Sequence, residues 1–388
     1  MIVTFKSGID DYIALRGASH PSLADIFFEF LLYLRFHFSS SIEKKETFGK
    51  NPANPVVTFS RNFVNMSIPS NAILRFEPIF QKRVWGGRAI EDTLGKTLPD
   101  PEEPYGESWE ISAREEADSR VLSGSYEGQT LTQLWQDPET RKEIFGSSAP
   151  ESDRFPLLCK ILDAQDKLSI QVPPPAEVAD RLGGEPKTEV WFIAHAEPGA
   201  ELYVGVKEGV TDEIFHHALE NGSVESLVHS IPVETGQHIF IPSGRLHAIG
   251  AGLLIYEIQQ NSDTTYRVYD WNRTGLDGKP RDLHVSESLQ CIDFTDVEPK
   301  MDSTKWSLLT ECEHFRLEKH RVGQGHSLNG ATEKRFAIVT VVSGELTMED
   351  EKFLPGEFFL VAAGYDGEVP VGGPEGAEVL LTLWPTST

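Results

Sequence analysis

The sequence predicts a mainly β protein, in which short strands close into two small β-barrels and short helices are inserted between the strands. Two observations support this fold class. From Ile73 onward, short apolar runs alternate with turns that contain Gly, Pro and Asp. One strand-and-turn motif also occurs twice along the chain. Many short strands with few helices are typical of a β-sandwich or a barrel.

The clearest strands are expected in the middle of the chain. Their apolar runs cover residues 156–164, 168–172, 190–194, 238–242 and 253–259. Two other stretches, 130–145 and 211–228, have apolar residues three to four positions apart and are expected to form short helices. Asp212 and Glu213 follow Thr211 and mark a helix start, because acidic side chains in the first turn complement the helix dipole.

The repeated motif divides the chain into two parts. The pattern G-x5-P-x-G-x-x-H at 236–247 is followed by G-x5-A-x-G-x-x-G at 356–367, and each has an apolar run inside its spacer. We interpret the two as the same β-hairpin-like unit in two related barrels. Only the first ends in a histidine, so only the first barrel is expected to bind a metal there. The predicted domains are a metal-binding domain with helical insertions at 71–300 and a degenerate, metal-free domain at 301–388.

Residues 1–70 differ from the rest of the chain. The part from 39 to 70 is rich in Ser, Asn, Lys and Pro, and Met66 precedes the first strand-like run. We expect 1–70 to be a poorly structured extension or a mis-assigned start. The apolar stretch 27–38 (FFEFLLYLRFHF) contains Glu29 and Arg35 and is far shorter than a bilayer span, so neither an export signal nor a membrane anchor is expected.

The composition excludes several classes of protein. Of the 388 residues, 39% are hydrophobic, and the formal net charge is −25. A chain this acidic repels nucleic acid, although a small anion can bind where a few Lys and Arg converge. Three dispersed cysteines argue against a disulfide framework and favour a reducing, cytoplasmic compartment. The expected partner is a small molecule, bound by a monomer or a weak homo-oligomer.

His247 is the first candidate for a metal ligand. A rigid Pro242 and a permissive Gly244 shape a tight turn, and the histidine begins the next strand. In a small barrel such a residue can point inward at the mouth, where a metal can bind. Taken alone, a histidine in a turn is more simply structural or exposed.

Two further segments add polar side chains at a spacing of two residues. In 168–172 this spacing places Ser169 and Gln171 on one face of a strand, and Lys187 and Glu189 share a face if their segment is extended. A carboxylate, an amide oxygen and an imidazole are ligands that zinc accepts. The simpler interpretation of Lys187 and Glu189 is a surface pair on an edge strand.

The segment 257–270 is polar for a protein interior. Residues 261–263 are expected to turn, and Arg267 then follows on a strand between Tyr266 and Tyr269. An arginine is suited to bind a phosphate or a developing enediolate there, because it stays charged and donates a fork of hydrogen bonds.

The spacing G-x5-P-x-G-x-x-H resembles the second sequence signature of the cupin superfamily, whose small jelly-roll barrels hold one metal with histidines and a glutamate. Longer runs resemble type I mannose-6-phosphate isomerases. These runs are FEPIFQKRVWGGR (76–88), GESWEIS (106–112), LLCKILDA (157–164), LSIQV (168–172), GGEPKTEVWF (183–192), IPSGRLHAIGAG (241–252) and EIQQNSDTTYRVYDWNR (257–273). The resemblance extends from about Leu74 to the C-terminus and is only loose in the second barrel.

This resemblance implies a zinc-dependent, reversible interconversion of mannose 6-phosphate and fructose 6-phosphate through a cis-enediolate. It also implies one zinc ion in each chain. The family's metal ligands correspond to Gln171, Glu189 and His247.

The resemblance also implies roles for four other residues. The hexose 6-phosphate is expected near Ser169, Lys187 and Arg267. Ser169 and Lys187 would bind its phosphate, while Glu257 and Arg267 line the catalytic side. Arg267 and the metal would stabilise the negative charge of the enediolate. Glu257 and a metal-bound water are both candidates for the proton-transferring group.

One position departs from the family pattern. The family has Gln-x-His-Pro where this chain has Gln171-Val-Pro173-Pro174, so a ligand histidine is replaced by a residue without a donor atom. Three protein ligands plus a water still make a workable catalytic zinc shell. His195 and His238 are the two candidates for a histidine that takes the place of the missing ligand.

Two alternatives remain open from the sequence. The first is a non-catalytic sugar-phosphate-binding cupin that has lost its metal through Pro173. The second is an isomerase with the same site that acts on another hexose phosphate, such as glucose 6-phosphate.

Overall fold

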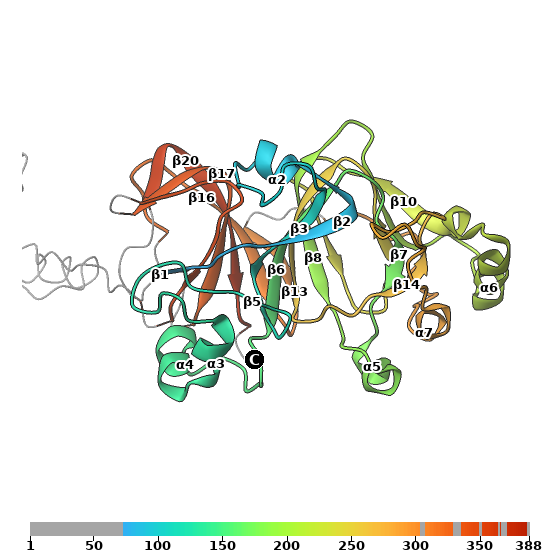
Figure 1. Cartoon of the computed structure of the whole chain (residues 1–388), viewed down its shortest axis with the longest axis horizontal. Helices are drawn as coiled ribbons and strands as arrows, with labels where there is room; N and C mark the ends of the chain where they lie inside the picture. Colours follow the sequence, from blue (N-terminus) through green and yellow to red (C-terminus); the bar gives the residue numbers. More distant parts are fainter. Residues whose placement is uncertain are drawn as a thin grey trace, which may run out of the picture. The chain divides into compact units, whose positions relative to one another are not determined.

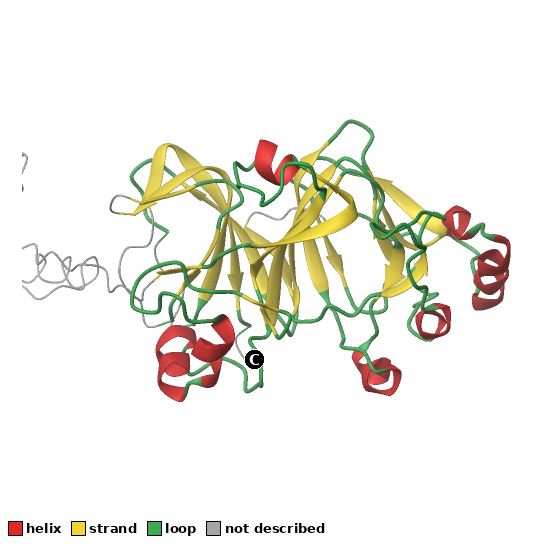
Figure 2. Cartoon of the chain, viewed as in Figure 1, coloured by secondary structure: helices red, strands yellow, loops and turns green. Residues whose placement is uncertain are grey.

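The computed structural model describes residues 73–302, 307–328, 335–348, 351–363, 365 and 371–385, which belong to one compact unit, Ser70–Thr388. The predictions for residues 1–70 lie outside the described residues, as do Gly364 and Gly367 of the second motif. Strands are the predominant regular structure of the described chain, and short helices lie at their edges (Figure 2). The prediction of a mainly β protein is confirmed, whereas the division into domains at residue 300 stays a prediction.

The described strands form three large antiparallel sheets. The six-stranded sheet has the order β11 (His238–Ile241), β8 (Glu189–Ala196), β13 (Leu253–Gln260), β6 (Leu157–Ala164), β3 (Tyr105–Ile111), β2 (Ile79–Gly87). The five-stranded sheet has the order β10 (Val228–Pro232), β9 (Glu201–Val206), β12 (His247–Ile249), β7 (Ile170–Val172), β14 (Tyr266–Tyr269). All five strands that the sequence predicts between residues 156 and 259 are therefore present.

The seven-stranded sheet contains the C-terminal strands and begins with the first described strand. Its order is β1 (Ile73–Arg75), β19 (Phe358–Val361), β17 (Ala337–Met348), β20 (Val371–Leu383), β16 (Arg316–Val322), β15 (Ser307–Glu311), with β18 (Glu351–Phe353) paired to β17. A two-stranded ribbon, β4 (Ala113–Arg114) with β5 (Ala117–Asp118), stands apart. The first part of the repeated motif has the same structure twice, since Gly236 and Gly356 have φ values of 89° and 83° and each precedes a strand, β11 or β19.

The six-stranded sheet lies between the other two (Figure 1). Successive side chains of a strand point to opposite faces, so a central sheet must be apolar on both. In β6, Cys159 and Ile161 enter the core shared with the seven-stranded sheet, whereas Leu162 enters the core shared with the five-stranded sheet. This arrangement buries the middle of β6 completely and makes any polar residue there exceptional.

The described helices are short and lie outside the sheets. They are α2 (Ala89–Asp92), α3 (Leu131–Gln136), α4 (Pro138–Phe145), α5 (Ala176–Leu182), α6 (Asp212–Asn221), the 3-10 helix Val224–Leu227, and α7 (Val285–Leu289). The single helix predicted at 130–145 is two, because Asp137 has extended backbone (ψ 122°) and caps a new helix that begins at Pro138. None of these described helices is long and apolar enough to cross a membrane.

Candidate active site

A cavity of about 570 Å³ lies between the five-stranded and six-stranded sheets. Its charged lining consists of the cations Lys82, Arg83, Lys160, Lys187, Arg267 and Arg281 and the acids Glu107, Glu257, Asp263 and Asp277. Cations therefore outnumber acids locally, although the whole chain has a net charge of −25. A cationic cavity in an acidic protein is suited to an anionic ligand.

Three functional side chains form a row in the five-stranded sheet, and two of them, Gln171 and Arg267, line the cavity. In the five-stranded sheet, His247 of β12 is paired with Gln171 of β7, and Gln171 is paired with Arg267 of β14. Paired residues of neighbouring strands point to the same face of a sheet. The register therefore brings together three of the residues predicted to act in the site.

The opposite wall carries a second row. In the six-stranded sheet Trp191 is paired with Glu257, Glu257 with Lys160, and Lys160 with Trp109. Trp191 Nε1 donates to Glu257 Oε1 at 2.8 Å, and Lys160 Nζ lies 3.7 Å from Glu257 Oε2. The same amine lies 4.9 Å from the ring centroid of Trp109. The two rows face each other across the cavity.

The three predicted metal ligands converge around His247, and Gln171 is the one of them that lines the cavity. His247 Nε2 lies 3.1 Å from Gln171 Nε2 and 3.3 Å from Glu189 Oε1. On the other side of the ring, Nδ1 lies 3.0 Å from the Arg245 carbonyl oxygen, which can only accept, so Nδ1 carries the proton. Burial and the charge of Lys187 lower the pKa of His247 to about 3. The imidazole is therefore neutral and directs the lone pair of Nε2 at Gln171 and Glu189.

Glu189 provides the test of whether these residues fit a metal. Its side chain is 1% exposed, and neither carboxylate oxygen has a hydrogen-bond partner among the described residues. Burial and the neighbouring charge of Glu257 raise its pKa well above the usual value. When Glu189 is ionised, its Oε1 and His247 Nε2 are both acceptors, so a cation between them would relieve the contact. Rotating the Gln171 side-chain amide by 180° exchanges its nitrogen for its oxygen and brings a third donor atom to the same point. One imidazole nitrogen, one carboxylate and one amide oxygen fit a divalent metal.

Pro173 follows Gln171 and supplies no fourth ligand. It is buried, and its carbonyl oxygen accepts from Gly244 N at 2.9 Å. The two histidines considered as replacements lie elsewhere: His195 Nε2 is near Glu197 Oε1 on an exposed edge, and His238 Nε2 contacts the Leu309 carbonyl oxygen. The described chain contains no group of three His, Cys, Asp or Glu able to hold a metal. A metal here therefore depends on the amide of Gln171.

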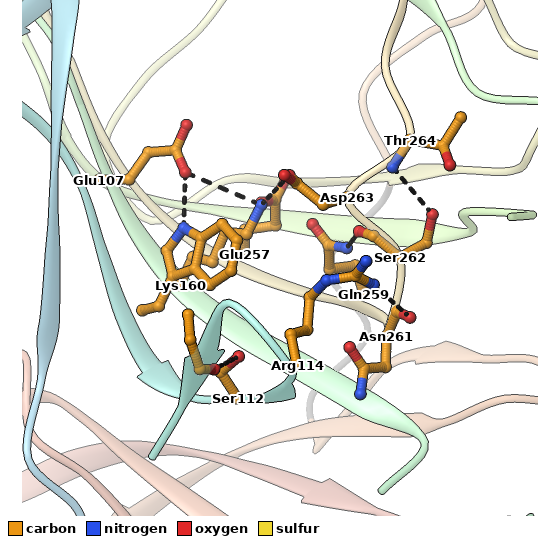
Figure 3. A network of polar contacts seen from close by, with 12 residues as sticks. Glu107, Ser112, Arg114, Lys160, Glu257, Gln259, Asn261, Ser262, Asp263 and Thr264 are labelled. Atoms are coloured by element: carbon orange, nitrogen blue, oxygen red, sulfur yellow. Dashed lines mark hydrogen bonds and ion pairs between the residues drawn. The ribbon is translucent and has the colours of Figure 1, made fainter. Parts of the chain in front are cut away.

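Lys160 is the centre of a buried ion-pair network (Figure 3). Its amine lies 3.9 Å from Glu107, 3.7 Å from Glu257 and 4.0 Å from Asp263. Burial favours the neutral amine, but the charges of Glu107 and Glu257 outweigh this effect and raise the pKa of Lys160. A permanent positive charge is thus held beside the carboxylate of Glu257.

Glu107 connects this network to a second cation. It accepts from Arg83 Nε at 2.8 Å and from Arg83 Nη2 at 3.2 Å, and Trp109 Nε1 donates to it at 2.6 Å. Although burial acts to raise the pKa of Glu107, the charges of Lys160 and Arg83 and the indole hydrogen bond lower it to about 2. Glu107 therefore stays ionised and fixes both cations at the cavity wall.

The residues predicted to bind the sugar phosphate also lie at the cavity. Arg267 Nε donates to Ser169 Oγ at 3.3 Å, and its Nη1 donates to the Asp282 carbonyl oxygen at 2.7 Å. Burial lowers the pKa of Arg267. Lys187 is 5% exposed and lines the cavity together with Ser169. The structure thus brings all seven predicted site residues to one region.

Sequence reasoning assigned no role to several residues of the cavity. Lys160, Glu107, Arg83 and Asp263 are among them. A signal for Lys160 exists in the sequence, because it is a charge in the middle of the otherwise apolar run LLCKIL. Buried lysines are rare unless they are paired, so such a residue marks a functional site. The carboxylates that pair with it come from distant segments and have no comparable signal.

Comparison with known proteins identifies the family. Residues 73–184 match the family model of the type I phosphomannose isomerase catalytic domain. The mannose-6-phosphate isomerase ManA of Bacillus subtilis (strain 168) is 37% identical over 281 residues, which cover 70% of this chain and 86% of ManA. A crystal structure of mannose 6-phosphate isomerase from Bacillus subtilis has a TM-score of 0.67 and 30% identity, covering 80% of this chain and 99% of that one.

A more distant structure shares the fold. It is a mannose 6-phosphate isomerase bound with zinc and yttrium, at 16% identity and a TM-score of 0.59, and the match covers 80% of this chain and 99% of that one. The chain therefore belongs to the type I mannose-6-phosphate isomerase family and is a sugar-phosphate isomerase.

Proposed function

We propose that this isomerase interconverts mannose 6-phosphate and fructose 6-phosphate with one zinc ion held by Gln171, Glu189 and His247. The observation that carries the proposal is the convergence of an unprotonated imidazole nitrogen on a buried carboxylate without a hydrogen-bond partner. The zinc in the related structure supports the choice of metal. Carboxylate, amide oxygen and imidazole leave a catalytic zinc with room for substrate.

The reaction moves a proton between C1 and C2 of the sugar while negative charge develops on the neighbouring oxygens. When bound, zinc supplies a positive charge that stabilises these oxygens. Arg267 is held by Ser169 and by the Asp282 carbonyl, so it can donate to the enediolate without reorganising. Glu257 is our candidate for the proton-transferring group, because Trp191 orients its carboxylate and Lys160 adjoins it.

The phosphate group is the part of the substrate that does not react. Lys187 and Ser169 are proposed to bind it, since both line the cationic cavity. Binding energy from this remote group would align the reacting carbons with Glu257 and Arg267.

The central experiment combines metal analysis with an activity assay. The purified protein is expected to contain about one zinc ion per chain and to convert mannose 6-phosphate to fructose 6-phosphate until a chelator is added. An unchanged turnover rate in the presence of the chelator would contradict the metal mechanism. Absence of turnover with zinc added would favour the non-catalytic alternative at Pro173.

Two variants distinguish the loss of the metal from the loss of the proton-transferring group. Glu257→Gln is expected to keep the zinc and to lower kcat by about 100-fold or more, as for loss of a general acid–base group. Glu189→Gln is expected to lose the zinc. If both variants lose the metal equally, Glu257 acts as a ligand rather than in proton transfer.

A further inference from the structure

A second cationic corner of the cavity has no role in the mechanism above. We propose that Arg281, held in place by Asp270, is a further binding residue for the phosphate group and makes the enzyme specific for phosphorylated sugars. This inference rests on the proposed function for the identity of the substrate. Its physical basis is a fixed guanidinium beside Arg267 at the cavity wall.

The position of Arg281 is determined by two hydrogen bonds. Its Nε donates to Asp270 Oδ2 at 2.7 Å, and its Nη2 donates to Asp270 Oδ1 at 2.5 Å. Both bonds use one edge of the planar guanidinium. The Nη1 group makes no hydrogen bond to another described residue, and the side chain lines the cavity. Arg281 thus resembles a pre-oriented donor whose free edge is available to a ligand.

Asp270 anchors more than one arginine. It is 6% exposed and also accepts from Arg273 Nε at 3.1 Å and from Arg273 Nη2 at 2.9 Å. Although burial acts to raise the pKa of Asp270, the hydrogen bonds and charges of the two arginines lower it. One ionised carboxylate thus holds two guanidinium groups, and Arg273 is in addition paired with Asp166.

Arg267 adds a third positive charge to the same corner. Arg267 and Arg281 both line the cavity, and burial and the charge of Arg281 lower the pKa of Arg267 against the opposing charges of Asp270 and Asp282. The loop that carries Arg281 is tied to Arg267 through the carbonyl of Asp282. Guanidinium groups of like charge repel each other unless an anion offsets them, and the free edge of Arg281 can donate hydrogen bonds to a phosphate dianion.

Asp277 is the one acid of this loop that also lines the cavity. Its Oδ1 accepts from Lys279 N at 3.0 Å, so part of its hydrogen-bonding capacity is used to shape the turn. Among the charged residues that line the cavity at this corner, Asp277 is one carboxylate against Arg267 and Arg281. The corner therefore favours a doubly charged phosphate over a neutral sugar hydroxyl.

Arg273 offers a matched control. It shares the carboxylate of Asp270 with Arg281, but its Nη1 lies 3.3 Å from Asp166 Oδ2 and it does not line the cavity. Replacing either arginine removes one of the two partners of Asp270. Only Arg281→Gln removes a guanidinium from the cavity wall.

The experiment compares Arg281→Gln, Arg273→Gln and the wild type by calorimetric titration with inorganic phosphate and by steady-state kinetics with mannose 6-phosphate. Arg281→Gln is expected to weaken phosphate binding and raise KM by about tenfold or more, the effect of losing a hydrogen bond to a charged group. Its kcat is expected to change much less. Arg273→Gln is expected to leave phosphate affinity within about threefold of the wild type. The phosphate affinity of Arg281→Lys is expected to lie between those of the two glutamine variants, because lysine keeps the positive charge but lacks the paired donors of a guanidinium.

Three outcomes would overturn the proposal. The first is unchanged phosphate affinity in an Arg281→Gln protein whose melting temperature matches the wild type. The second is an equal loss of phosphate affinity in Arg281→Gln and Arg273→Gln, which would mean that Arg281 acts only through Asp270. The third is a wild type that does not bind phosphate. If phosphate binding depends on Arg281 while no isomerisation of hexose phosphates occurs, the proposed function fails and the phosphate site stands.

Discussion

Pro173 lies two residues after Gln171, where related sequences lead us to expect a histidine ligand. A proline side chain has no donor atom, and the backbone around it is fixed by the bond from Gly244 N to its carbonyl oxygen. Neither His195 nor His238 reaches the site. At the scale of the residue, metal affinity in this chain therefore depends on two oxygen donors and one imidazole.

Restoring the histidine tests this point. Pro173→His is expected to tighten zinc binding by about tenfold or more, since even residues that only support metal ligands change affinity by about 10- to 100-fold. Titration of the metal-free protein with zinc measures the change directly. Pro174→Ala, at the neighbouring position, serves as a control for altered backbone. Unchanged affinity in Pro173→His would mean that the shell is completed by another group.

Glu107 allows a pH prediction. Its pKa of about 2 in the folded protein lies below the ordinary value of 4.5, so the stability it contributes is fully present above pH 4.5 and is lost as pH falls from there toward 2. Glu107→Gln is expected to lower the free energy of unfolding by about 3–5 kcal/mol at neutral pH, because it leaves Lys160 and Arg83 without their shared partner.

The measurement is denaturant unfolding of both proteins between about pH 6 and pH 2.5. The free energy of unfolding should fall less steeply with acidification in Glu107→Gln than in the wild type. Parallel curves would mean that Glu107 titrates normally in the folded protein. Glu116→Gln, which removes an exposed carboxylate from an ion pair with Arg114, is the matched control.

At the scale of the element, the site depends on strand register. His247, Gln171 and Arg267 share a row only because β12, β7 and β14 pair at these residues. A shift of one residue in any strand would turn its side chain to the opposite face. The turn before β12 sets this register, and Gly244 in that turn has a φ of 88°, which favours glycine.

Gly244→Ala tests the role of the turn. A left-handed backbone costs a residue with a Cβ about 1–2 kcal/mol, and the new Cβ would lie 3.1 Å from Pro175 Cγ and 3.2 Å from the Cys291 carbonyl oxygen. We expect lower stability and weaker zinc binding together. Gly209→Ala has a similar φ of 82° with open space around it, so it should lose stability without losing zinc affinity. Equal zinc affinity in the two variants would contradict the proposed link to His247.

At the scale of the whole described unit, one hydrophobic core joins the six-stranded and seven-stranded sheets. Phe336 is fully buried in it and lies 5.6 Å from Phe145 and 5.5 Å from Phe155, measured between ring centroids. The proposed domains 71–300 and 301–388 therefore share apolar packing. We expect them to unfold together rather than in separate steps.

Phe336→Ala is expected to lower the free energy of unfolding by about 3–5 kcal/mol, the usual cost of a large cavity in a core. Calorimetry should show one transition that moves to lower temperature for the whole protein. Leu354→Ala, at a side chain of the same region that is 47% exposed, should change little. A second transition that stays at the wild-type temperature would show that the two proposed domains unfold independently.

Local patterns in the sequence account for much of the fold. Alternation with a period of two and turn glycines depend only on neighbouring residues, which is why the predicted strands from 156 to 259 are all present. The segment 130–145 differs from its prediction. The spacing of its apolar residues predicts one continuous helix, but a second helix begins at Pro138. The predicted cytoplasmic location, oligomeric state and domain boundary stay predictions.

The sequence by itself determined the fold class, the family and the seven candidate residues, because these are carried by short motifs. Only the tertiary structure decided what surrounds them. Lys160 meets Glu107 and Asp263 through strand pairing and folding of segments far apart in the chain, and Arg281 reaches the cavity through its bonds to Asp270. The physical reason is that register and burial are properties of the packed sheets, and no short stretch of sequence contains them.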